Sequence, residues 1–73
     1  MNTRRIRTLH RIEHKLFIAL CKGVPKPMSD EVLARIEAMA MDTARELLPT
    51  YLKRRDGALW LHRLISTGKV WDL

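Results

Sequence analysis

The residues with the most chemical potential stand in one short segment, His10-Arg11-Ile12-Glu13-His14. Its order, H-x-x-E-H, is that of inverted zinc proteases, in which two histidines one helical turn apart bind zinc and the glutamate activates water. Cys21 is a further potential ligand, but it lies two helical turns beyond His14, so that one ion cannot touch all three side chains. Because no third ligand is placed and so short a chain has no room for a substrate cleft, we expect neither a metal nor another cofactor.

Nucleophilic catalysis has no better support in the sequence. Ser29 and Ser66 are explained as a helix cap and a helix end. The chain has no glycine-rich phosphate loop, and its acidic residues form no pair with an evident pocket. We therefore expect a protein that is not an enzyme.

Charge is distributed unevenly along the 73 residues, which carry a formal net charge of +6. Residues 1–28 hold seven Lys or Arg against one acid, residues 29–49 hold two against five, and residues 50–73 hold five against two. A basic start and a mildly basic end thus flank an acidic middle. This pattern predicts that the ends of the chain meet a polyanion or an acidic protein surface.

Two groups of cations are the candidate partner-binding residues. The first follows one helix face at spacings of three and four and comprises Arg4, Arg7, Arg11 and Lys15, with Arg5 beside them; the second is Lys53-Arg54-Arg55. Arginine binds phosphates and carboxylates in bidentate fashion, although a solvated helix face has the same composition. A helix-turn-helix is disfavoured because the helix after the first loop is acidic, so we expect contact with phosphates and not with base edges.

The elements that carry these residues are predicted to be helical throughout. Apolar residues recur at spacings of three and four, which is typical of amphipathic helices. We expect one all-α domain with a flexible basic N-terminus and three helices, at about residues 3–22, 30–48 and 50–66, followed by a short tail at 67–73. Gly23 should end the first helix, Ser29 should cap the second, Pro49 should kink or break the chain, and Gly68 should stop the third helix.

Two tryptophans differ in their surroundings. Trp60 lies among leucines and is expected in the core. Trp71 lies beyond Gly68 in the segment Lys69-Val70-Trp71-Asp72-Leu73, where it either caps the small core or anchors a partner. We expect this tail to become ordered on binding, with Trp71 as the buried anchor.

Length and cysteine content limit the compartment and the size of the core. A chain of 73 residues hides only about 60% of its unfolded surface on folding, which leaves much surface for binding. The single Cys21 permits no internal disulfide, which favours a reducing cytoplasm, and no apolar run approaches the roughly 20 residues that span a membrane. We expect a cytoplasmic monomer.

The Arg-rich start Met1-Asn2-Thr3-Arg4-Arg5-Ile6-Arg7, the compact helical middle and the tail Lys69-Val70-Trp71-Asp72-Leu73 together resemble the small RNA-polymerase-binding regulators of lytic Xanthomonas phages. The resemblance covers the whole chain. It implies a protein of the host cytoplasm that docks near the RNA exit channel on the β′ N-terminus and β flap of bacterial RNA polymerase. Such a protein displaces or disarms sigma at initiation and promotes antitermination, with possible contact to nascent RNA or DNA phosphates.

A second likeness leads to an alternative function. Met28-Ser29-Asp30 before Leu33-Ala34, and the pair Val70-Trp71, are similar to the hemolysin-expression-modulating family of nucleoid-protein partners. We expect transcription regulation through RNA polymerase, which is what the first resemblance implies. A basic nucleic-acid or nucleoid-associated binding protein is the alternative, and a structural subunit that pairs with itself is the third.

Overall fold

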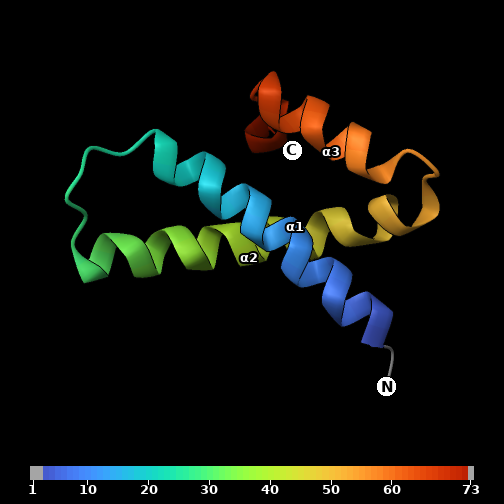
Figure 1. Cartoon of the computed structure of the whole chain (residues 1–73), viewed down its shortest axis with the longest axis horizontal. Helices are drawn as coiled ribbons and strands as arrows, with labels where there is room; N and C mark the ends of the chain where they lie inside the picture. Colours follow the sequence, from blue (N-terminus) through green and yellow to red (C-terminus); the bar gives the residue numbers. More distant parts are fainter. Residues whose placement is uncertain (1–2, 73) are drawn as a thin grey trace.

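The computed structural model describes residues 3–72, and these form a small all-α domain, as predicted. The elements in order are α1 (Thr3–Lys22), α2 (Asp30–Lys53), α3 (Gly57–Ser66) and a short 3-10 helix, η1 (Lys69–Asp72). Figure 1 shows α1 lying obliquely across α2. After the end of α2 the chain turns back, and α3 and η1 lie above α2 in this view.

The helix ends predicted from local sequence are confirmed for the first two helices at the loop that joins them. α1 ends at Lys22, and the amide of Gly23 donates to the Leu20 carbonyl at 3.1 Å. The Ser29 hydroxyl accepts a hydrogen bond from the Val32 amide at 3.2 Å, so Ser29 is the N-cap of α2. Acids follow in the first turn of α2, where the helix dipole favours negative charge.

The core forms where α1 crosses α2. Ile12 and Leu16 of α1 are fully buried, and small residues of α2, Ala40 and Ala44, face the same cluster and permit a close approach of the two helices. The remaining buried members of the cluster are Leu47, Leu48, Leu61 and Val70. Ile6, which the periodicity placed on the buried face of α1, is instead 43% exposed, since it lies beyond the part of α1 that contributes to the core.

Pro49 does not break the chain, so the predicted boundaries 30–48 and 50–66 are wrong at this point. α2 continues through Pro49 to Lys53, and the next helix begins only at Gly57. A proline inside a helix costs about 3 kcal/mol because it removes one hydrogen bond and crowds the preceding turn. Leu47 and Leu48 before the proline are buried, and each such side chain contributes about 1.5–3 kcal/mol, which offsets that cost.

The C-terminal segment is folded onto the domain, which corrects the expectation of a tail that becomes ordered only on binding. Gly68 has φ +75° and follows α3, so it reverses the chain as a left-handed glycine after a helix does. Val70 in η1 is then 1% exposed and belongs to the core cluster, whereas Trp71 remains 39% exposed. The alternative interpretation, a segment that caps the core, is correct for Val70. Residues 1, 2 and 73 lie outside the described residues, and from Thr3 onward the expected flexible start is helical.

Candidate functional site: an arginine groove

A hollow with a volume of about 590 Å³ lies between the first half of α1 and the corner where α2 meets α3. We name it the arginine groove for the five arginines that line it, Arg4, Arg7, Arg11, Arg54 and Arg55. Thr8, Tyr51 and Leu52 also contribute to its walls, and the residues that line it include no acid. The groove is therefore strongly electropositive.

The α1 wall is built by helical spacing alone. Arg4, Arg7 and Arg11 recur every three or four residues, so they share one face of α1. The Thr8 hydroxyl between them donates to the Arg4 carbonyl at 2.8 Å and is used within the helix. Among residues 3–72 the guanidinium groups of these arginines form no ion pair or side-chain hydrogen bond, so they are available to a ligand.

The corner between α2 and α3 holds one arginine in place and leaves its neighbour available. Arg54 donates from Nε to Asp56 Oδ1 at 2.8 Å and from its terminal nitrogen to Oδ2 at 3.1 Å, and it lies 5.6 Å from the centre of the Trp60 ring. The hydrogen bond from Arg54 holds the pKa of Asp56 below its ordinary value, and the same bond raises the pKa of Arg54. Asp56 therefore binds Arg54 and does not cap α3, although it occupies the N-cap position. Arg55 has no such partner within the described chain.

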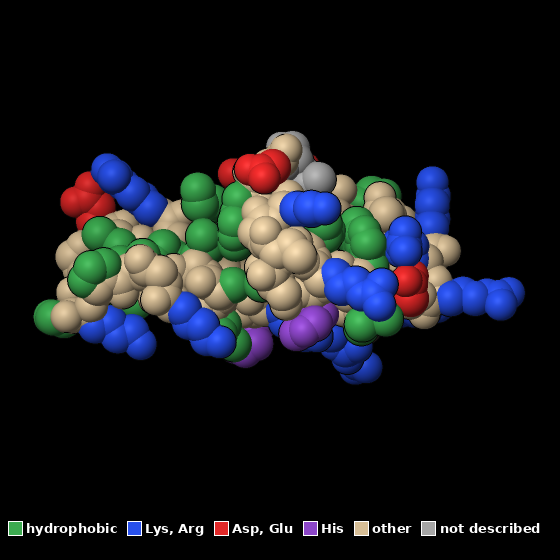
Figure 2. Space-filling view, turned by 90° about the horizontal axis from the view of Figure 1, so that it is seen from above, with side chains coloured by type: hydrophobic (Ala, Val, Ile, Leu, Met, Phe, Trp, Pro, Cys, Tyr) green, Lys and Arg blue, Asp and Glu red, His purple; other side chains and the backbone are tan. Residues whose placement is uncertain are grey.

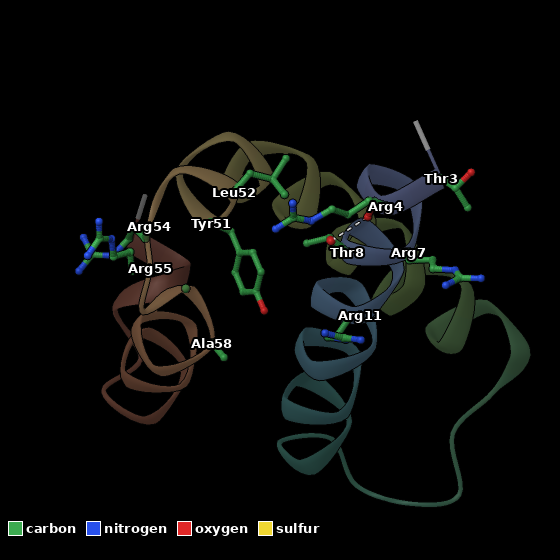
Figure 3. A pocket seen from close by; sticks show the side chains of 11 residues that line it. Thr3, Arg4, Arg7, Thr8, Arg11, Tyr51, Leu52, Arg54, Arg55 and Ala58 are labelled. Atoms are coloured by element: carbon green, nitrogen blue, oxygen red, sulfur yellow. Dashed lines mark hydrogen bonds between the residues drawn. The ribbon is translucent and has the colours of Figure 1, made fainter. Parts of the chain in front are cut away.

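Tyr51 provides an aromatic surface inside the groove. In Figure 3 its ring stands in the gap between the start of α3 and the Arg4 to Arg11 face of α1, with its hydroxyl directed toward α1. Gly57 packs against this residue, because a Cβ at position 57 would come 2.8 Å from the Tyr51 carbonyl oxygen and 3.3 Å from Cγ of the ring. Sequence analysis missed Tyr51. The available signal was a single tyrosine standing just before the basic segment Lys53-Arg54-Arg55.

The structure brings together five of the nine predicted binding residues and separates the others from them. The residues predicted to bind a partner that do not line the arginine groove are Arg5, Lys15, Lys53 and Trp71. Lys15 lines a different hollow, between α1 and α3. The basic residues along α1 thus line two separate hollows, and residues 67–72 line neither of them.

The arginines of the groove do not converge on one point. In Figure 3 Arg4 reaches toward Leu52 at the end of α2, while Arg54 and Arg55 extend on the side of the corner that faces away from α1. On the face seen in Figure 2, cationic side chains project along the whole length of the molecule and acidic ones appear at scattered points. Such a distribution suits an extended anionic surface or chain better than one small anion.

The segment with zinc-protease order carries no cluster of ligands. His10 and His14 are both exposed on α1, and Cys21 is partly buried two turns away. Among residues 3–72 no three His, Cys, Asp or Glu side chains lie close enough together to hold a metal ion. Within the same residues, none of the helices combines the length and the apolar character that crossing a membrane requires.

Comparison of the chain with protein-family models, with curated proteins and with solved structures finds no match.

Proposed function

We propose that this protein is a non-catalytic regulator of transcription that binds bacterial RNA polymerase and uses the arginine groove to contact an anionic part of the enzyme. The observation that carries the proposal is the groove itself, in which Arg4, Arg7, Arg11 and Arg55 form no ion pair with residues 3–72. Unpaired arginines gathered in one hollow favour bidentate binding of carboxylates or phosphates.

The choice of RNA polymerase as the partner rests on the resemblance to the phage regulators. By that resemblance the protein docks on the β′ N-terminus and the β flap, inhibits initiation by displacing or disarming sigma, and allows elongating polymerase to pass terminators. The groove supports this choice in one respect: a rigid, electropositive hollow on a small helical domain is suited to an acidic protein surface close to nucleic acid.

The partner is tested by capture from a bacterial lysate that has been treated with nuclease. The immobilised protein should retain the β and β′ subunits, because nuclease removes contacts that nucleic acid bridges and leaves protein contacts. The double variant Arg7→Glu/Arg11→Glu should lose this capture. Its matched control is Arg35→Glu/Arg45→Glu, which makes the same change in net charge on exposed positions of α2, and it should retain the subunits. Equal capture by both double variants would remove the groove from the interface.

A second candidate function, direct binding of single-stranded nucleic acid, is favoured by the position of Tyr51. Proteins that bind single strands combine a cationic groove with an aromatic ring on which a base stacks, and such stacking contributes about 1–3 kcal/mol per base. Tyr51 lies between two arginine-bearing walls in this way. Salt distinguishes the two functions: affinity for a fluorescent oligonucleotide should fall steeply with ionic strength, whereas a protein interface with apolar anchors loses less.

A further inference from the structure

A second hollow, with a volume of about 480 Å³, lies between the later half of α1 and the later half of α3. We name it the lysine-rimmed groove. Lys15, Ile18 and Lys22 of α1 form one wall, and His62 and Ile65 are the principal residues of the α3 wall. It shares no residue with the arginine groove, so its function is a separate question.

Each wall of this groove carries an isoleucine that is at least partly open to water. Ile18 is 42% exposed, although α1 has polar residues on the same face, and Ile65 is only partly buried where it packs against the core cluster. Apolar surface exposed to water is unfavourable, in proportion to its area. A ligand that covers Ile18 would remove part of this unfavourable exposure.

The rim of the groove is cationic. Lys15 precedes Ile18 by three residues and Lys22 follows it by four, so all three side chains lie on one face of α1. Neither lysine forms an ion pair with another described residue, and the residues lining the groove include no acid. At about 1.5 Å of rise per residue, the two lysine Cα atoms stand about 10 Å apart along the helix.

We propose that the lysine-rimmed groove docks one acidic amphipathic helix of a partner protein. An apolar side chain of that helix rests on Ile18 and Ile65, and carboxylates two turns apart on the same helix meet Lys15 and Lys22. Both walls of the groove are helices, and a hollow of this form accepts the apolar face of a helix. The cationic rim selects the acidic flanks.

Two other occupants fit the groove less well. A flat anionic membrane would meet the lysines and Ile18 on α1 but would leave the hollow between α1 and α3 unfilled. A second copy of this chain would have to offer α2, which is acidic and has Met39 53% exposed. The two carboxylates of α2 that stand seven residues apart, Asp30 and Glu37, flank Leu33, which is partly buried, and the exposed Met39 lies outside this pair. The α2 surface therefore does not place an exposed large apolar side chain between two carboxylates two turns apart.

The test uses the full chain and a synthetic helical peptide as the probe. The peptide places a pair of leucines between two glutamates seven residues apart in an Ala/Gln background, and its twin carries lysines in place of the glutamates. In a nuclear magnetic resonance titration of the labelled protein, the acidic peptide should shift backbone signals of residues 15–22 and 62–66. The lysine twin should bind at least tenfold more weakly, a factor that corresponds to about 1.4 kcal/mol.

Variants separate this groove from the arginine groove. Ile18→Asn and Lys15→Glu/Lys22→Glu should each weaken the acidic peptide at least fivefold while melting like the parent, because these positions are exposed or partly exposed. Arg4→Gln/Arg7→Gln should leave the titration within twofold, even if it abolishes capture of RNA polymerase. The two proposals therefore succeed or fail independently.

Three results would overturn the inference. The first is the absence of localised shifts at millimolar acidic peptide, and the second is equal binding of the two peptides. The third is an alternative occupant: sedimentation with anionic phosphatidylserine vesicles, or concentration-dependent self-association, that the Ile18→Asn change abolishes.

Discussion

The contact between Gly57 and Tyr51 joins the fold to the arginine groove, and Gly57→Ala tests it directly. α3 begins at Gly57, which is buried against the last turns of α2. A methyl group at this position would come 2.8 Å from the Tyr51 carbonyl oxygen and 3.3 to 3.4 Å from two ring carbons. The oxygen belongs to a helical backbone and cannot rotate away, so the start of α3 must shift.

Two opposing contributions set the magnitude of the effect. Alanine is favoured over glycine in a helix by about 0.5–1 kcal/mol. Overpacking of a close contact costs about 1–3 kcal/mol. The clash against backbone places this variant toward the costly side, so we expect a net loss of about 1–2 kcal/mol in the free energy of unfolding. For a domain of this size each kilocalorie lowers the melting temperature by about 4–8 °C.

Thermal and urea denaturation followed by circular dichroism measure this loss. The matched control is Gly23→Ala, where the new Cβ would lie 3.7 Å from the Leu20 carbonyl oxygen, an ordinary contact distance. That control should melt within a few degrees of the parent. The reasoning is refuted if Gly57→Ala is as stable as Gly23→Ala, because α3 would then not start against Tyr51.

Three further predictions concern the tail, the corner and the metal. Val70→Ala should lower the free energy of unfolding by about 1.5–3 kcal/mol, because it removes buried methyl groups from a residue that is 1% exposed. A variant that melts like the parent would show that η1 is not packed in the core. The bond to Arg54 lowers the pKa of Asp56, so the bond stabilises the fold above the ordinary carboxyl pKa of about 3.9, and that stabilisation is lost as the pH falls through the lower pKa of the folded state. The difference in melting temperature between the parent and Asp56→Asn should therefore shrink below about pH 4, and a difference that grows there would contradict the assignment. Dialysis against a chelator should leave the helical signal and the melting temperature unchanged, since His10 and His14 lie exposed without a third ligand beside them, and a cooperative loss of helix would disprove this.

Local sequence predicted most of the fold, because helix ends are governed by nearby residues. The cap at Ser29 depends on a side-chain hydrogen bond three residues away, and the end of α3 before Gly68 depends on a glycine of positive φ, and both were predicted correctly. The end of α1 at Lys22, just before Gly23, was also predicted correctly. Pro49 and Val70 depend instead on burial against residues far along the chain. Periodicity and propensity do not contain that information, so the continuation of α2 through Pro49 was missed and the packing of the C-terminal segment was predicted only as an alternative.

The candidate site was predicted in part for the same reason. Arg4, Arg7 and Arg11 share one helix face by spacing alone, so the sequence identified this wall of the groove. The other wall exists because α2 extends to Lys53 and the chain then turns at residues 54–56, which places Tyr51 and Arg55 at the groove, with the Tyr51 ring directed toward α1. The position of Tyr51 in the groove depends on where α2 ends, and its place just before Lys53-Arg54-Arg55 is the one indication of it in the sequence.

The central proposal is that the arginine groove binds RNA polymerase, and the affinity of purified bacterial core polymerase for three forms of the protein tests it most directly. The parent, Arg7→Glu/Arg11→Glu and Arg35→Glu/Arg45→Glu would be labelled with a fluorophore and titrated with the enzyme at fixed ionic strength. We expect the groove variant to bind at least a hundredfold more weakly than the parent, a factor that corresponds to about 2.8 kcal/mol, and the charge-matched α2 variant to bind within threefold of the parent. Equal loss in both variants would show that net charge alone drives binding, and unchanged affinity of the groove variant would contradict the proposal outright.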